Sequence, residues 1–228
     1  MSERAKILGR IREALSVAAP FPGAHEPAAH PIAATTASAR AGEWLPRVGQ
    51  SRDEQIAAFA ANAADLRAEF FPLASGAELV AQLQKMRYVD AWKKIATHSG
   101  ELTGLIQRAL DLPTVFTDAV YDGNALESCD VGITECDALV AQTGSVLVTN
   151  RTCGGRALSV LPPHHIVLAR RDQLVRDLPA AFQWLRRTYD GNYPSMISFI
   201  TGPSRTGDIE RILVLGAHGP RRLTIFMV

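Results

Sequence analysis

Short apolar runs alternate with helical patterns along most of this 228-residue chain, and this alternation constrains the fold more than any other feature. The stretches 95–97, 114–117 and 223–228 have the length and the β-branched or aromatic content of buried strands. Segments with helical spacing of their apolar residues lie between such runs. This pattern is typical of a sheet covered by helices. We therefore predict an α/β fold with a mixed, mainly parallel sheet flanked by helices.

Serine-led strings mark the starts of two predicted helices. The string Ser-Arg-Asp-Glu at the start of 51–70 is a capping box, and Ser-Gly-Ala-Glu at the start of 75–88 repeats it. We expect a shorter helix within 105–110. Helical spacing returns over 171–189, where Pro179 either kinks one helix or lies in the first turn of a second helix.

The first fifty residues differ from the rest of the chain. Residues 2–17 predict a helix with one apolar stripe, made of Ile7, Leu8, Ile11 and Leu15. Residues 19–50 contain five prolines among alanines, which favours an extended linker. We therefore divide the chain into an N-terminal helix and linker (1–50) and an α/β domain (51–228). The first helix either covers its own domain or docks on a partner.

Charge and hydropathy exclude several classes of protein. With 24 basic and 23 acidic residues the net charge is +1, so no overall field attracts nucleic acid or lipid. No stretch approaches the ~20 apolar residues that span a bilayer, and the N-terminus lacks the apolar segment of a signal peptide. We predict a soluble, cytoplasmic protein with neither a nucleic-acid nor a membrane partner.

The cysteines argue against an electron carrier. Cys129, Cys136 and Cys153 form no C-x-x-C pair, and an odd count without a signal peptide indicates reduced thiols. Three are too few for an iron–sulfur cluster held by four thiolates. Dinucleotide-binding and Walker A glycine motifs are also missing from the sequence. We predict no cofactor.

The central stretch 130–149 predicts two or three short strands, with Gly132 and Gly144 at the turns between them. The string Gln142-Thr143-Gly144-Ser145 forms a tight turn that is able to present backbone N–H groups to a carboxylate or phosphate. Turns of this composition are more often structural, so both interpretations stay open.

A glycine-rich basic loop follows at 151–156, where Arg156 is a candidate positive group for an anion site. We expect strands at 157–160 and 166–169. Cys153, within the loop, lacks an identifiable base and is a weak candidate nucleophile.

His164 and His165 invite a metal interpretation. Adjacent side chains on an extended segment point in opposite directions, so only one of the two can face a given site. The sequence offers no third ligand at a recognisable spacing, and we therefore predict no metal site.

Polar groups concentrate between residues 200 and 220. An apolar strand over 196–200 ends at Gly202-Pro203, and we expect the amides of 204–207 to be free to converge on an anion beside the forked donor Arg205. Asp208 and Glu210 follow, as candidates to orient Arg205 or to hold a substrate hydroxyl or a metal ion. A second strand, 211–215, leads to His218 between two glycines. The alternative is a plain loop in which Asp208 caps a short helical turn and His218 is a hydrogen-bonded turn residue.

The strings Thr201–Glu210 and Leu215–Pro220 closely resemble the C-terminal signature of the LUD domain family, lactate utilization protein C. The string at 142–145 resembles the second signature of that family, which commonly has Glu where this chain has Gln142. The change removes a charge and leaves Glu135 and Asp137 as the nearest carboxylates.

The resemblance implies a fold similar to the sugar-phosphate isomerase and CoA-transferase group. It also implies membership of a three-component system that oxidises L-lactate to pyruvate, in which the other two components carry iron–sulfur clusters. The leading hypothesis is an accessory subunit with a pocket for a small anion, and a homo-oligomer is an open alternative. The other hypotheses are a stand-alone enzyme acting on a sugar phosphate or acyl-CoA, which leaves open whether the chain is itself a catalyst, and a scaffold or regulatory protein.

The predicted site residues fall into two groups. The candidates for proton transfer are His218, Asp208 and Glu210. The candidates for ligand binding are Thr143, Gly144, Ser145, Arg156, Gly202, Ser204, Arg205 and Thr206.

Overall fold

The structure is a computed structural model that describes residues 3–16, 46–118, 120–206, 214–215 and 218–228. The chain divides into two compact units, residues 1–45 and residues 46–228. In the first unit, helix α1 (Glu3–Ser16) confirms the predicted N-terminal helix, and its Ile7 and Leu8 side chains are exposed. Most of the predicted linker lies outside the described residues. No helix in the described ranges is long and apolar enough to cross a membrane.

A six-stranded sheet forms the centre of the second unit, and all of its pairings are parallel. In spatial order its strands are β1 (Glu69–Pro72), β12 (Arg222–Met227), β7 (His164–Ala169), β4 (Val131–Glu135), β2 (Ile95–Thr97) and β3 (Thr114–Phe116). The strands predicted at 95–97, 114–117 and 223–228 are confirmed within one residue at each end.

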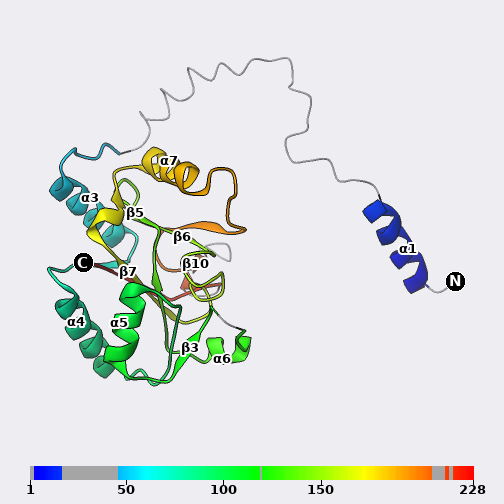
Figure 1. Ribbon diagram of the computed structural model, residues 1–228, viewed down its shortest axis with the longest axis horizontal. Helices are drawn as coiled ribbons and strands as arrows, with labels where there is room; N and C mark the ends of the chain where they lie inside the picture. Colours follow the sequence, from blue (N-terminus) through cyan, green and yellow to red (C-terminus); the bar gives the residue numbers. More distant parts are fainter. Residues whose placement is uncertain (1–2, 17–45, 119, 207–213, 216–217) are drawn as a thin grey trace, which may run out of the picture. The chain divides into compact units, whose positions relative to one another are not determined.

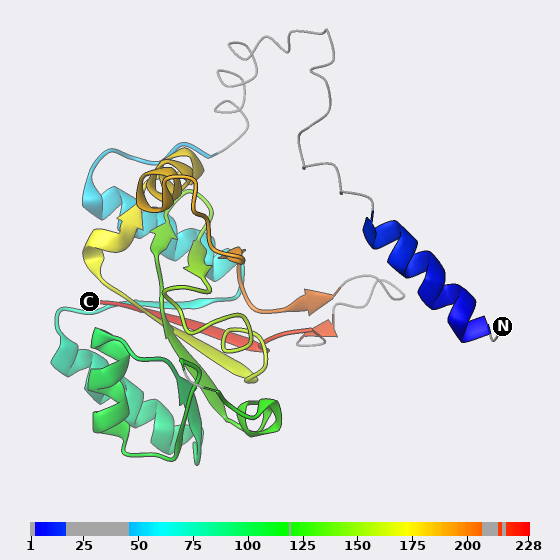
Figure 2. The same cartoon turned by 45° about the vertical axis from the view of Figure 1, so that its right-hand side comes forward.

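A smaller sheet has the strand order β8 (Leu174–Val175), β5 (Ala138–Val140), β6 (Ser145–Thr149) and β9 (Ile197–Ile200). The pairings of β6 with both of its neighbours are antiparallel. A two-stranded antiparallel ribbon, β10 (Arg205–Thr206) with β11 (Val214–Leu215), follows β9 and is drawn in orange and red in Figure 2. The sheet structure is thus mixed and its largest sheet is parallel, as predicted.

Helices cover the sheets in layers (Figure 1). Their bounds are α3 (Arg52–Asp65), α4 (Gly76–Val89), α5 (Glu101–Leu110), α6 (Gly123–Glu127), the 3-10 turn η1 (Arg171–Gln173) and α7 (Leu178–Tyr189). Helices α4 and α5 pack on one face of the six-stranded sheet, while α3 and the smaller sheet pack on the other face. Helix α7 covers the outer face of the smaller sheet.

Strand β7 shows why the large sheet is buried on both faces. Its Ile166 and Leu168 join the core that α4 and α5 contribute to, whereas Val167 and Ala169 join the core that contains Phe59 of α3. A strand buried on both sides is apolar at successive positions, as parallel strands usually are. The alternation extends back to His164 and His165, which are therefore placed on opposite faces.

The capping box at Ser51 is confirmed, but the predicted extension of that helix to residue 70 is wrong. Helix α3 ends at Asp65, and Arg67 then adopts a φ of 63°, a left-handed conformation that turns the chain. Residues 69–72 form the edge strand β1 beside β12. The local sequence favours continuing the helix, but pairing with β12 makes residues 69–72 a strand.

Two further predictions are corrected around β4. Gly132 lies inside this strand and not at a turn. A glycine is needed there because the carbonyl oxygen of Leu158 passes 2.5 Å from the point where a Cβ of Gly132 would stand. The predicted strand 157–160 is a turn that crosses the sheet at this glycine. Any larger residue at 132 would block that crossing.

Within the helical pattern at 171–189, Pro179 does not kink one long helix but lies near the start of a separate helix. Pro179 lies in the first turn of α7, where its missing N–H is no loss, and Asp177 caps the helix. Residues 174 and 175 pair with β5 as strand β8 instead of continuing a helix.

We expect Phe59→Ala to lower the free energy of unfolding by about 3–5 kcal/mol, because Phe59 is completely buried and contacts the ring of Phe70 at a centroid distance of 4.8 Å. Tyr88→Ala, on exposed surface of α4, is the control and should change stability by less than about 0.5 kcal/mol. Urea denaturation of both variants measures the difference. Equal stabilities would contradict the assignment of Phe59 to the core.

Candidate functional site

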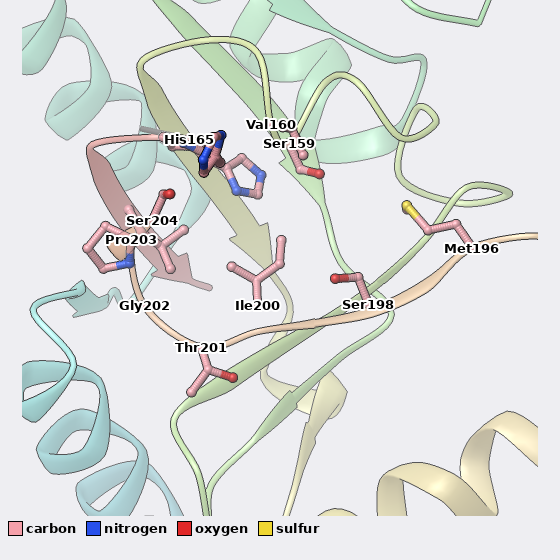
Figure 3. Close-up of a pocket in the computed structure, with 14 residues that line it drawn as sticks. Ser159, Val160, His165, Met196, Ser198, Ile200, Thr201, Gly202, Pro203 and Ser204 are labelled. Atoms are coloured by element: carbon pink, nitrogen blue, oxygen red, sulfur yellow. The ribbon is translucent and has the colours of Figure 1, made fainter. Parts of the chain in front are cut away.

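A cavity of about 240 Å³ opens between the end of β9 and the starts of β7 and β12. We call it the β9–β12 pocket. Its lining residues are Ser159, Val160, His165, Met196, Ser198, Ile200, Thr201, Gly202, Pro203, Ser204, His218, Gly219, Pro220 and Leu223. Figure 3 shows His165, from the large sheet, and Ser159, from the turn after Leu158, across the cavity from Ser198 and Ile200 of β9.

Backbone hydrogen bonds hold the segments around the pocket together. The amide of Ser204 donates to the carbonyl of Pro220 at 2.8 Å, which ties the loop after β9 to the loop before β12. The amide of Arg221 donates to the carbonyl of Pro163 at 2.8 Å, which ties the same loop to the approach to β7. Gly202 has a φ of 86°, a conformation that favours glycine, and turns the chain towards Pro203.

The prediction that the amides of 204–207 converge on an anion is wrong for the described part of that segment. The Ser204 amide is used by Pro220, and Arg205 and Thr206 pair with β11 as strand β10. Of the strand predicted at 211–215, only residues 214–215 are described, and they form β11. A side-chain pocket therefore replaces the backbone anion site that we expected at this loop.

The predicted loop residues reach the pocket to different extents. Gly202, Ser204 and His218 line it. Arg205 is exposed and is not among the lining residues, although its guanidinium lies 3.4 Å from the point where a Cβ of the lining residue Gly202 would stand. Thr206 belongs to β10, which pairs with β11. Asp208 and Glu210 lie outside the described residues.

The turn at 143–145 has a structural role in this chain. The amides of Thr143 and Gly144 both donate to the carbonyl of Val140, so they are not available to a ligand. Asn62 of α3 donates to the carbonyls of Ala141 and Gln142 at 2.8 and 3.1 Å. Neither Thr143 nor Gly144 lines the pocket.

Ser145 and Arg156 form hydrogen bonds to lining residues of the pocket or to their neighbours. The Ser145 hydroxyl hydrogen bonds to that of Thr201, a lining residue, at 2.9 Å. Arg156 donates to the carbonyl of Ser195 at 2.6 Å, next to the lining residue Met196. Both predicted residues thus position lining residues and do not line the cavity themselves.

Gln142 uses both ends of its amide group. Its Nε2 donates to the carbonyl of Pro46 at 3.0 Å, and its Oε1 accepts from the amide of Leu178 at the start of α7 at 3.3 Å. A glutamate at this position would have no hydrogen to donate to Pro46 at neutral pH. The glutamine of this chain is therefore a structural bridge.

Sequence reasoning missed the role of His165, which lines the buried side of the pocket. Its side chain is 1% exposed, and its Nε2 lies 2.9 Å from the hydroxyl of Thr134 in β4. Its Nδ1 has no hydrogen-bond partner among the described residues. Burial, with a smaller effect of His164, lowers the pKa of His165 to about 3, so its ring is neutral at physiological pH.

His164 lies on the opposite face of β7, as we expected for adjacent strand residues. Its Nε2 lies 2.9 Å from the hydroxyl of Thr224, and its ring contacts that of Trp92 edge-on. Burial, followed by the charge of Arg222, lowers its pKa to about 3. Within the described ranges, no three His, Cys, Asp or Glu side chains are grouped so that they could hold a metal ion.

A second polar cluster surrounds the buried Asp137. Its carboxylate accepts from the hydroxyl of Thr152 at 2.6 Å and lies 3.8 Å from the thiol of Cys153. Burial raises the pKa of Asp137, and burial together with Asp137 raises the pKa of Cys153 to about 12. A thiol with so high a pKa is a poor nucleophile.

Glu135 occupies the place where α/β sheets commonly bind ligands, at the carboxyl ends of the strands. Its Oε1 accepts from the amides of Leu102 and Thr103 in the first turn of α5, at 2.9 and 3.2 Å. Its Oε2 forms an ion pair with Arg170 at 3.4 Å. The anion-binding N-terminus of α5 is thus filled by the protein's own carboxylate.

Comparison with known families identifies the domain. The model of the LUD domain matches residues 56–228, which is about three quarters of the chain. The chain belongs to the LUD domain family. This confirms the resemblance that the signature strings indicated, and the match begins close to the start of the predicted domain at residue 51.

Curated relatives of this LUD domain protein are named lactate utilization protein C. One from Shouchella clausii is 39% identical over 103 residues, which are 45% of this chain and 45% of the relative. One from Halalkalibacterium halodurans is 31% identical over 144 residues, or 62% and 63% of the two chains. The chain therefore spans about half the length of the first of these relatives.

A solved structure supports the fold. The crystal structure of a DUF162 family protein from Deinococcus radiodurans superposes with a TM-score of 0.62 and 21% sequence identity, over 79% of this chain and 99% of that one. The α/β architecture of the LUD domain is thus shared with an experimental structure.

We expect Gly144→Ala to destabilise the LUD domain by about 2 kcal/mol or more, because an added Cβ would stand 2.7 Å from the amide nitrogen of Ala63 and would strain a φ of 63°. Gly155→Ala is the matched control, since Gly155 has a φ of 88° but open space around it. It should cost only the strain, about 1–2 kcal/mol. Urea unfolding of both variants measures the difference, and equal losses would contradict the close contact with α3.

We expect acid to weaken the LUD domain partly through His164 and His165. The folded pKa of each is about 3, below the ~6.5 of an unfolded histidine. Between those values the unfolded chain binds more protons, so stability is greatest above pH 6.5 and falls as the pH drops towards 3. His164→Gln removes one such group, and its unfolding free energy should fall less steeply between pH 6 and 4.5, by roughly 1.4 kcal/mol per pH unit. An unchanged slope would rule out this contribution.

Proposed function

We propose that this LUD domain protein is an accessory subunit of an L-lactate oxidation system, and that it binds a small organic acid in the β9–β12 pocket. The observation that carries the proposal is the chemistry of the pocket wall. Four hydroxyl-bearing residues and two histidines line the pocket, and the wall has no carboxylate among the described residues; the hydroxyl-bearing residues are Ser159, Ser198, Thr201 and Ser204. Donors without a competing negative charge favour an anionic ligand.

A positively charged side chain lies next to one lining residue of the pocket. The exposed guanidinium of Arg205 lies beside Gly202, and His218 lines the pocket on the opposite loop. Arg205 makes no ion pair with another described residue. We assign Arg205 the role of attracting the carboxylate, and His218 that of a hydrogen-bonding or proton-transferring group of the pocket wall. Asp208 and Glu210 remain proposed partners of these two residues.

Volume favours a small acid over the larger alternatives. The pocket holds about 240 Å³. Drug-sized ligands occupy pockets of roughly 300–1,000 Å³, and acyl-CoA is larger still. The apolar residues Val160, Met196, Ile200 and Leu223 would contact the carbon chain of a short acid. A hydroxy or oxo acid of about the size of lactate fits this wall.

The lactate system itself is suggested by the relatives named lactate utilization protein C. The three cysteines are free and buried, and they are too few for a four-thiolate cluster. We therefore propose that electrons pass through iron–sulfur subunits that associate with this chain, and that the complex is cytoplasmic. The N-terminal segment 1–50, outside the proposed domain 51–228, is a candidate contact for those subunits.

We expect L-lactate or pyruvate to bind the purified protein with a measurable heat in titration calorimetry, and sugar phosphates and CoA to bind more weakly or not at all. Arg205→Ala should weaken binding about tenfold, since a hydrogen bond to a charged partner contributes about 1.5–3 kcal/mol and Arg205 is exposed. Arg187→Ala, on the exposed surface of α7, is the control and should bind like the wild type.

The outcomes separate the three functions considered. Binding of none of these compounds would favour a scaffold and contradict the proposal. Turnover of a sugar phosphate or acyl-CoA by the purified chain would favour a stand-alone enzyme. Copurification with iron–sulfur proteins, together with lactate or pyruvate binding, is the result that the proposal requires.

A further inference from the structure

The buried side of the β9–β12 pocket contains one polar atom that the fold itself does not satisfy. His165 Nε2 lies 2.9 Å from the Thr134 hydroxyl, while Nδ1 has no partner among the described residues. The two nitrogens of an imidazole point in divergent directions, so Nδ1 points away from β4. His165 pairs in register with Leu223 of β12, and both residues line the pocket. An unsatisfied buried nitrogen is costly unless a ligand or water completes its hydrogen bonding.

The hydrogen-bond inventory of Thr134 decides which nitrogen carries the proton. Thr134 is completely buried, and its hydroxyl has no partner except His165 among the described residues. If His165 Nε2 donated to Thr134, the hydroxyl proton of Thr134 would itself have no acceptor in a dry environment. If the hydroxyl donates to Nε2, that proton is satisfied and the neutral ring carries its hydrogen on Nδ1. The second arrangement leaves a single unpaired donor, and this donor belongs to a residue of the pocket wall.

We propose that His165 is a ligand-binding residue that donates its Nδ1 hydrogen, as a neutral imidazole, to a carboxylate or keto oxygen of the small acid. This inference rests on the proposed function, and it names the atom that receives the ligand. Thr134 is the positioning residue, because its hydroxyl fixes the tautomer of the ring. His218 lines the same pocket and is exposed, so a short acid would lie between the buried neutral donor of His165 and the exposed ring of His218.

The route of the chain brings a second polar residue of the pocket wall close to His165. The turn carrying Ser159 and Val160 follows Leu158, which crosses β4 at Gly132, and Gly132 is the register partner of His165. The missing side chain at 132 therefore leaves room for that turn beside the ring. Ser159 is 7% exposed and lines the same wall, so its hydroxyl is a second neutral group for the ligand.

Two substitutions of His165 separate its two nitrogens. The side-chain nitrogen of asparagine lies the same number of bonds from Cα as Nδ1, whereas that of glutamine corresponds to Nε2. We expect His165→Asn to keep the donor to the pocket and to bind L-lactate or pyruvate within about threefold of the wild type. We expect His165→Gln to keep only the contact with Thr134 and to bind about tenfold more weakly or worse.

Titration calorimetry with L-lactate and with pyruvate measures these affinities, and thermal unfolding checks that both variants are folded. Loss of binding in His165→Asn with retention in His165→Gln would overturn the assignment, as would equal affinities in both variants.

The tautomer is measured independently of any ligand. Long-range ¹⁵N–¹H correlation spectra of the labelled wild-type protein distinguish a ring protonated at Nδ1 from one protonated at Nε2, and the spectrum of His165→Asn identifies the signals. An Nδ1–H ring is the expected result, and an Nε2–H ring would overturn the inference even if lactate binds. If the wild type binds no acid while the ring is Nδ1–H, the proposed function and ligand role fail and the tautomer assignment stands.

Discussion

The parallel pairing of β7 between β4 and β12 is the constraint on which the rest of the structure depends. It buries β7 on both faces, so successive residues of one short strand enter two different cores. The same alternation separates His164, which packs against Trp92, from His165, which reaches the pocket. One register thus determines both the main hydrophobic core and the orientation of the buried polar group. A slip by one residue would exchange the two histidines.

The pocket is built from segments that are distant in sequence but tied together by a few backbone bonds. The bond from Ser204 to Pro220 and the bond from Arg221 to Pro163 connect the loop after β9, the loop before β12 and the approach to β7. The hydroxyl of Ser145 supports Thr201 from the neighbouring strand. Because these contacts lie within the fold, the cavity wall does not require a ligand to hold its loops together.

Local pattern was enough to predict strands β2, β3 and β12 and the starts of helices α1, α3 and α4. The run 223–228 has the composition of a buried strand, and the capping box at Ser51 is formed as expected, because both signals depend on neighbouring residues. The helix end near residue 65 and strand β1 were missed, since β1 exists only through its pairing with β12. Gly132 was misplaced for a similar reason, because the segment that crosses it comes from residue 158.

The candidate site likewise has residues that local sequence predicts and residues that depend on distant segments. Gly202, Ser204 and His218 were predicted from their local composition and do line the pocket, whereas the buried donor of His165 depends on Thr134 in a different strand. The turn at 143–145 had the composition of an anion site, yet its amides are used within the turn. No property of that string alone reveals that α3 packs against it.

The contacts of Glu135 affect whether a free acid can bind at the carboxyl ends of the strands. Its carboxylate is bound by the first turn of α5 and by Arg170, so a built-in anion already fills that position. A free acid arriving there would compete with a group whose effective concentration is set by the covalent chain, of the order of millimolar or higher. The protein's own carboxylate therefore occupies this edge of the sheet, whereas the β9–β12 pocket opens at the opposite ends of β7 and β12.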